Sequence, residues 1–358
     1  MNPLLKIACA VLLLYVVIFS LGVPMNPGLT GTDTRVVKPG TNVIQVDGYR
    51  THFLSEAQSL RVFLEADSVY YCTEATAISD DLLKATVLLP ETLNAPILSV
   101  YVNNREDGTV YLPLAFRSEG AAISPGSRPT PECKVSVEND QHASFGFPFQ
   151  PVIFESIRNL MWHVPMWFTM FFLMFISVFQ SVLYMLKYQR QSDGLDEAVR
   201  GSLVALVHDR KAAAAVSAGM VFCILGLITG SIWARFTWTE WWTNDPQLNG
   251  ALVVFLLYAS YFVLRATIED EEKRARLSAV YNIFACVMMI VLLMVMPKFV
   301  SSLHPGKEGT PAFSTYDLDS SLRLVFYPAV AGWILLGYWF YNLRYRINKL
   351  QSEANEIM

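Results

Sequence analysis

The sequence predicts an all-α polytopic membrane protein with six transmembrane helices and a β-rich extracytoplasmic domain inserted between the first and second helices. Three observations support this fold class. Hydrophobic residues make up 53% of the chain and charged residues only 16%, whereas a soluble domain carries about 25% charged residues. The missing charges fall in six apolar blocks, each near the roughly 20 residues that cross a bilayer. A long polar segment separates the first block from the other five.

The predicted spans are residues 4–23, 162–186, 213–233, 250–268, 279–297 and 324–343. The first span could instead be a cleaved signal peptide, because Lys6 precedes its apolar run. We favour a retained anchor, since the run is nearly as long as a span and no clear cleavage site follows it. Lys and Arg concentrate between spans 2 and 3, between spans 4 and 5, and in the C-terminal tail. The positive-inside rule therefore puts both termini in the cytoplasm.

These spans divide the chain into four parts: an N-terminal anchor (1–23), an extracytoplasmic insert (24–158), a five-helix membrane domain (159–343) and a cytoplasmic tail (344–358). Short β-prone runs separated by turn signals predict a small β-sandwich in the insert. Asp47-Gly48 lies between two such runs and predicts a hairpin turn.

The insert shows no catalytic constellation, and its His52 and His142 are interpreted as surface or turn residues. Cys72 and Cys133 both fall within it. A disulfide is chemically permitted outside the cytoplasm, and two buried thiols are the alternative. The net charge of −4 gives no indication of a nucleic-acid partner.

The external loop after the third span is rich in tryptophan, with Trp233, Trp238, Trp241 and Trp242 within ten residues. Tryptophan collects at membrane interfaces, so an aromatic belt is one interpretation. Belt residues, however, are usually scattered among several helix ends. Their concentration in one loop favours a platform on which a broad, planar ligand stacks.

Two histidines, His163 at the start of span 2 and His304 after span 5, are expected on the same external face as this loop. A neutral imidazole is a good axial ligand for heme iron, so two histidines on opposite sides of the ring predict bis-histidine coordination. The alternative is that each histidine only forms hydrogen bonds in an interfacial loop. Asp245, which precedes Pro246, predicts a helix cap that fixes the loop together with tryptophan N–H groups.

These motifs resemble the CcmC family of cytochrome c maturation, within the WWD heme-handling superfamily. The resemblance covers residues 159–186 and 221–306. It rests on Trp162-His163-Val164-Pro165, on Thr229-Gly230-Ser231-Ile232-Trp233 with the ungapped run to Asp245, and on Leu303-His304-Pro305-Gly306. The family's tryptophan before the aspartate is Asn244 here, which thins the aromatic surface.

The resemblance implies that the chain binds heme b through His163 and His304 as axial ligands, with Trp233, Trp238, Trp241, Trp242 and Asp245 completing the site. It further implies a multi-pass protein of the bacterial inner membrane that passes heme, on the periplasmic side, to a CcmE-like heme chaperone. An ABC-type complex of the same pathway would then release the loaded chaperone. Such a protein binds and transfers heme and is not an enzyme.

Two alternatives stay open. One is a cytochrome c heme lyase of the same superfamily, although those proteins are longer and carry additional intramembrane histidines. The other is a docking subunit that binds no heme and uses the external domain for protein contacts. We interpret the insert, which has no counterpart in the compact form of the family, as a docking or lid domain.

Overall fold

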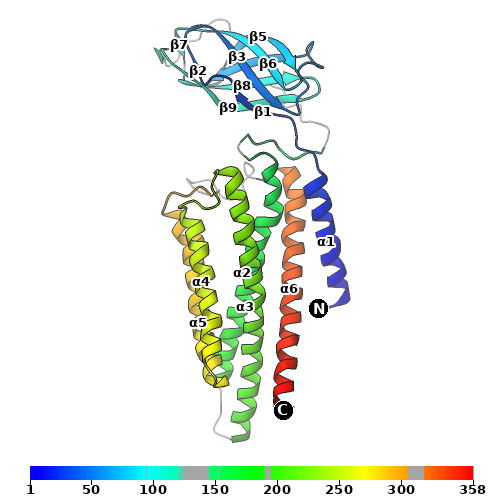
Figure 1. The fold of residues 1–358 in the computed structure, drawn as a ribbon, viewed down its shortest axis with the longest axis vertical. Helices are drawn as coiled ribbons and strands as arrows, with labels where there is room; N and C mark the ends of the chain where they lie inside the picture. Colours follow the sequence, from blue (N-terminus) through cyan, green and yellow to red (C-terminus); the bar gives the residue numbers. More distant parts are fainter. Residues whose placement is uncertain are drawn as a thin grey trace. The chain divides into compact units, whose positions relative to one another are not determined.

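The computed structural model describes the chain except residues 94, 121, 124–144, 152, 190–194, 305–317 and 358 (Figure 1). The chain forms two compact units, one of residues 1–22 and 156–358 and one of residues 23–155. His142 and Cys133 lie outside the described residues. Cys72 is disulfide-bonded, whereas the thiols of Cys9, Cys223 and Cys286 are free and buried.

The first unit is a bundle of long helices, and six helices in the described part of the chain are long and apolar enough to cross a membrane. They are α1 (Pro3–Gly22), α2 (Leu160–Gln189), α3 (Leu195–Thr237), α4 (Pro246–Thr267), α5 (Glu271–Ile290) and α6 (Ser320–Ile357). The six predicted spans are thus confirmed, and the chain is a multi-pass membrane protein. Most helices extend beyond the apolar stretch that predicted them, and α6 continues through the segment expected to be a tail.

Small and polar residues let the helices approach closely. A Cβ on Gly219 of α3 would lie 2.9 Å from Met174 Cε of α2, and such small-residue contacts are typical of membrane bundles. Buried Asn282 of α5 donates to Ser177 and Ser181 of α2 at 2.5 and 2.9 Å. Inside lipid these bonds satisfy polar groups that water cannot reach.

The end of α5 brings the chain toward the tryptophan-rich loop. A π-helical turn, η2 (Val291–Val295), and a 3₁₀ turn, η3 (Met296–Lys298), follow α5 directly. A proline in a helix interior removes a backbone hydrogen bond and kinks or ends the helix, and Pro297 lies in η3. The segment that carries Ser302 and His304 begins where this helical run ends.

The second unit makes the all-α part of the predicted fold class wrong. It contains an eight-stranded sheet in the order β1-β3-β6-β5-β4-β8-β9-β2 and a two-stranded sheet of β10 and β7. The β-rich insert itself was expected. The strands are β1 (Gly28–Thr32), β2 (Val36–Val37), β3 (Gly40–Tyr49), β4 (Arg61–Ala66), β5 (Val69–Ser79), β6 (Leu82–Leu89), β7 (Thr92–Leu93), β8 (Ile97–Asn104), β9 (Gly108–Ser118) and β10 (Ala122–Ile123).

This sheet is not the predicted sandwich of two packed sheets. It curls until β1 and β9 lie side by side, so its inward side chains form one core of buried residues, among them Leu29, Ile44, Leu64 and Val100. The curled sheet therefore buries its apolar face against itself.

The hairpin expected at Asp47-Gly48 is also wrong, because β3 runs straight through both residues and pairs with β6. Gly48 is required for a different reason, the space that its neighbours occupy. A Cβ there would lie 2.1 Å from Thr51 Oγ1 and 2.9 Å from Phe53 Cε2. Glycine at this position permits a close approach of side chains and does not mark a turn.

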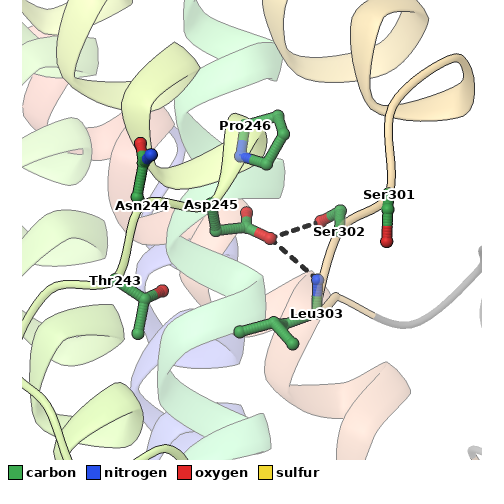
Figure 2. Close-up of a pocket in the computed structure, with 7 residues that line it drawn as sticks. All are labelled: Thr243, Asn244, Asp245, Pro246, Ser301, Ser302 and Leu303. Atoms are coloured by element: carbon green, nitrogen blue, oxygen red, sulfur yellow. Dashed lines mark hydrogen bonds between the residues drawn. The ribbon is translucent and has the colours of Figure 1, made fainter.

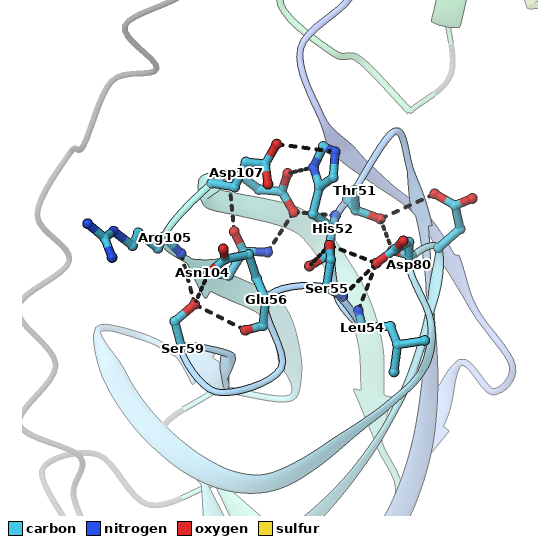
Figure 3. Close-up of polar contacts among 12 residues, drawn as sticks. Thr51, His52, Leu54, Ser55, Glu56, Ser59, Asp80, Asn104, Arg105 and Asp107 are labelled. Carbon is cyan, nitrogen blue, oxygen red and sulfur yellow. Dashed lines mark hydrogen bonds and ion pairs between the residues drawn. The ribbon is translucent and has the colours of Figure 1, made fainter.

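His52 is held by a buried carboxylate in this unit (Figure 3). Its Nδ1 lies 2.7 Å from Asp107 Oδ1, and its backbone N–H donates to Asp107 Oδ2 at 2.7 Å. Asn104 Nδ2 donates to the same carboxylate at 2.6 Å. The contacts join the segment before β4 to the β8–β9 turn, so His52, interpreted from the sequence as a surface or turn residue, has a structural role.

Replacing His52 with glutamine is expected to abolish a pH dependence in the stability of this unit. The hydrogen bond to Asp107 raises the pKa of His52 above its ordinary 6.5, against a lowering by burial, and the charges of Asp107, Glu106 and Asp80 add to the rise. Because the pKa of His52 is higher in the folded than in the unfolded protein, its protonation stabilises the fold. This stabilisation is complete below the unfolded pKa and disappears as pH rises through the folded pKa.

The measurement is hydrogen exchange of peptides from β4 and β9 in the full-length protein between about pH 5 and 8, corrected for intrinsic exchange. The exchange protection of the wild type should fall as pH rises, whereas that of His52→Gln should not depend on pH. His208→Gln, which changes a histidine of the helical unit, is the control and should show the same pH dependence as the wild type. Equal slopes in wild type and His52→Gln contradict the prediction.

Candidate functional site

Asp245 connects the tryptophan-rich loop to the segment after η3. It caps α4, as the sequence predicts, by accepting from the backbone N–H groups of Gln247 at 2.9 Å and Leu248 at 3.3 Å. Its other oxygen accepts from Ser302 Oγ and Leu303 N–H, both at 2.8 Å (Figure 2). These donors take the place of the tryptophan N–H groups that we expected to contact it.

The carboxylate of Asp245 also holds His304. His304 Nδ1 lies 3.1 Å from Asp245 Oδ1, and the carboxylate is only 1% exposed. Burial raises the pKa of Asp245, but the hydrogen bonds from Leu303 and Ser302 and the charge of His304 outweigh burial and hold it below its ordinary value. Because Nδ1 faces Asp245, coordination of a metal by His304 would use Nε2, the carboxylate–histidine arrangement common in metal sites.

His163, near the start of α2, lies against the end of α3. Its Nδ1 is 3.1 Å from Thr229 Oγ1. Gly230 makes this approach possible, since a Cβ there would lie 2.6 Å from His163 Cε1. His163 and His304, which the sequence groups in one site, lie within range of an electrostatic interaction.

The four tryptophans divide into two kinds. Trp233 packs edge-on against His163, with ring centroids 5.7 Å apart, and Trp238 packs against His304 at 5.4 Å. Trp241 and Trp242 are instead 60% and 37% exposed. One pair therefore supports the histidines, and the other presents an aromatic surface.

Asn244, the departure from the family pattern, has a structural role in this chain. It accepts from Asn249 Nδ2 at 2.8 Å, and Asn249 Oδ1 accepts from Trp242 Nε1 at 3.2 Å. The pair of asparagines thereby orients Trp242. A pocket of about 260 Å³ is lined by Asn244 and Asp245 among others, and it is smaller than the roughly 300–1,000 Å³ of typical small-molecule sites. A macrocycle would have to lie on the loop and its histidines, and not inside this pocket.

Comparison with known proteins identifies the same part of the chain. Residues 149–304 match the family model described as Cytochrome C assembly protein, and both histidines and the whole loop fall inside the match. Heme exporter protein C of Paracoccus denitrificans (strain Pd 1222) is 30% identical over 125 residues, 35% of this chain and 52% of that protein. The chain is CcmC-like. The resemblance predicted from the sequence is confirmed.

The similarity to CcmC proteins is confined to part of each chain. Heme exporter protein C of Haemophilus influenzae (strain ATCC 51907 / DSM 11121 / KW20 / Rd) is 28% identical over 165 residues, 43% of this chain and 63% of that protein. Cytochrome c biogenesis protein CcsA of Prochlorococcus marinus (strain NATL1A) is 32% identical over 76 residues, 21% of this chain and 24% of that protein. This chain thus spans between half and two thirds of the CcmC proteins named here, and residues 1–148 lie outside the family match.

Four residues at this CcmC-like site received no role from the sequence: Thr229, Gly230, Ser302 and Asn249. Thr229 and Gly230 lie in the matched Thr-Gly-Ser motif, which was a usable signal. Nothing in the sequence indicates Ser302 or Asn249, because their contacts depend on how the loop meets the segment after η3.

Replacing Gly230 with alanine is expected to displace His163. The added Cβ would lie 2.6 Å from its ring, and such overpacking costs about 1–3 kcal/mol, more than the roughly 0.5–1 kcal/mol that alanine contributes in a helix. The melting temperature in detergent should fall. Gly22→Ala, where a Cβ meets nothing within 4 Å, is the control and should melt no lower than wild type. A melting temperature for Gly230→Ala at or above that of wild type contradicts the prediction.

Proposed function

We propose that this chain binds heme b at the extracytoplasmic face of the bacterial inner membrane and delivers it to a CcmE-like periplasmic chaperone in cytochrome c biogenesis. The observation that carries the proposal is the pair of histidines, each with Nδ1 engaged by a second side chain and each packed edge-on against a tryptophan of one loop. The name of one relative, heme exporter protein C, supports the same cargo, and that of another, cytochrome c biogenesis protein CcsA, supports the same process.

The residues fit this ligand in two ways. Two neutral imidazoles that present Nε2 are a suitable axial pair for heme iron. Trp233 Nε1 is buried and has no acceptor among the described residues, so it is a donor that a heme propionate would satisfy. His163 and His304 would hold the iron, Asp245 and Thr229 would orient the imidazoles, and Trp241 and Trp242 would contact the macrocycle. The redox and electrophilic chemistry belongs to the heme.

Transfer, on this proposal, needs no catalytic residue, and the protein is a carrier and not an enzyme. The partners are heme, membrane lipid, the chaperone and the ABC-type complex that releases it. A cytochrome c heme lyase is the second candidate, since a cytochrome c biogenesis protein, CcsA, is among the relatives.

The test is the visible spectrum of protein purified in mild detergent from heme-replete cells. A Soret band is expected in wild type, and His163→Ala and His304→Ala should weaken or shift it. His208→Ala is a matched control, because His208 contacts Gln180 at 2.7 Å and not the loop. A colourless wild type, or unchanged spectra in both histidine variants, excludes the proposed heme site.

Delivery and lyase activity are separated by co-expression. With a CcmE-like chaperone, covalent heme should appear on the chaperone and disappear in the histidine variants. With an apocytochrome bearing CxxCH and no other maturation factor, no covalent cytochrome should form. Covalent cytochrome in that second experiment favours the lyase.

A further inference from the structure

The two histidines of the site are supported by chemically different groups. His304 Nδ1 faces the buried carboxylate of Asp245 at 3.1 Å, whereas His163 Nδ1 faces the hydroxyl of Thr229 at 3.1 Å. A carboxylate carries a full charge and a hydroxyl does not. The two imidazoles are therefore not equivalent as ligands.

The proton between His163 and Thr229 has a defined position. Thr229 Oγ1 lies 2.8 Å from the carbonyl oxygen of Leu225, one turn earlier in α3. Two oxygens at this distance need a hydrogen between them, and threonine in helices commonly donates to the carbonyl four residues back. The single hydroxyl hydrogen is thus used, so Oγ1 accepts from His163, and Nδ1 carries the ring proton.

A second acceptor and a second link hold the same arrangement. The Gly226 carbonyl also accepts from Thr229 Oγ1, at 3.2 Å, so the hydroxyl hydrogen has two backbone acceptors on the side away from His163. Asn159, the residue immediately before α2, donates from Nδ2 to the Thr229 carbonyl at 2.9 Å. The start of α2 is thus tied to both the backbone and the side chain of Thr229.

We propose that Thr229 is a positioning residue that keeps His163 in the Nδ1-protonated tautomer, and that His163 is the weaker axial ligand, released first when heme leaves. Carboxylate support raises the basicity of a ligating imidazole, which favours His304 as the retained ligand. The tautomer leaves Nε2 as the coordinating atom of His163. The order of release rests on the proposed heme-binding function; the tautomer does not.

The tautomer is tested without heme, by ¹⁵N NMR of histidine-labelled apo-protein in liposomes, with His163→Gln to assign the signal. Wild type should show Nδ1 protonated and Nε2 bare. Thr229→Val, which keeps the shape and removes the hydroxyl, should lower the Nδ1-protonated fraction, and Thr229→Ser should restore it. A Thr229→Val spectrum identical to wild type overturns the positioning role.

The order of release is tested on heme-loaded protein. His304→Gly should retain about 10-fold less heme than His163→Gly, the scale of losing a supported ligand. Added imidazole should restore the six-coordinate spectrum of His163→Gly. Thr229→Val should shift part of the wild-type spectrum toward five-coordinate heme, and Thr229→Ser should not.

Equal heme retention in the two glycine variants, or more in His304→Gly, overturns the order of release while leaving heme binding intact. A wild type without heme overturns the proposed function and the order of release together. The NMR experiment still decides the role of Thr229 in that case.

Discussion

Replacing Asp245 with alanine is expected to lower heme affinity about 10- to 100-fold, the usual effect of losing the group that orients a metal-binding histidine. The substitution also removes the cap of α4, which costs about 0.5–2 kcal/mol. It leaves the N–H of Leu303 and the hydroxyl of Ser302 without their acceptor. Both the segment that carries Ser302 and His304 and the first turn of α4 should therefore become less ordered.

The measurement is heme titration of the apo-protein followed by the Soret band, with the melting temperature recorded in parallel. Asp270→Ala is the matched control: Asp270 caps α5 by accepting from Lys273 N–H at 2.6 Å and has no contact with His304 among the described residues. It should lower the melting temperature and leave heme affinity unchanged. An Asp245→Ala variant with wild-type affinity contradicts the assigned role of the carboxylate.

Replacing Arg265 with methionine is expected to destabilise the bundle by about 3–5 kcal/mol, because it leaves a buried charge without its partner. Arg265, in the last turn of α4, donates to both oxygens of Asp209 of α3, at 2.6 and 2.8 Å. The side chains are only 17% and 5% exposed. The pair fastens α4 to α3 at the end of α4 away from the tryptophan loop.

The double variant Asp209→Leu/Arg265→Met should recover most of this loss, since replacing both charges by apolar groups is often close to neutral. Lys349→Met is the control, because the Lys349–Glu353 pair is 57% and 51% exposed and exposed pairs contribute about 0–1 kcal/mol. The measurement is the free energy of unfolding of each variant in detergent, obtained by denaturant titration. Equal stability of Arg265→Met and Lys349→Met contradicts the prediction.

What the sequence predicts well are features carried by local patterns. Six apolar blocks predict six helices, and Asp245 before Pro246 predicts a cap that is present. The predicted blocks are shorter than most of the helices, because hydropathy identifies only the part of a helix that lies in lipid. The backbone hydrogen bonds continue the helix beyond that part. Trp233 and Trp238 were grouped with Trp241 and Trp242, although only packing separates the first pair from the second.

What the sequence does not predict depends on contacts between distant segments. Asp47-Gly48 has the composition of a turn, but β3 continues through it, pairing with β6 as far as Asp47 and with β1 as far as Tyr49. Ser302 lies 57 residues from Asp245, so no spacing rule connects them. The sandwich prediction failed because strand count and strand length are compatible both with two sheets and with one sheet that curls.

The shared carboxylate of Asp245 has a thermodynamic consequence. The backbone amides of Gln247, Leu248 and Leu303 all donate to this one side chain. The first turn of α4 and the segment that carries His304 are therefore expected to open and close as one cooperative unit. A ligand that binds only the closed form stabilises it by mass action. Heme bound at His304 would therefore also stabilise the first turn of α4, through the carboxylate of Asp245.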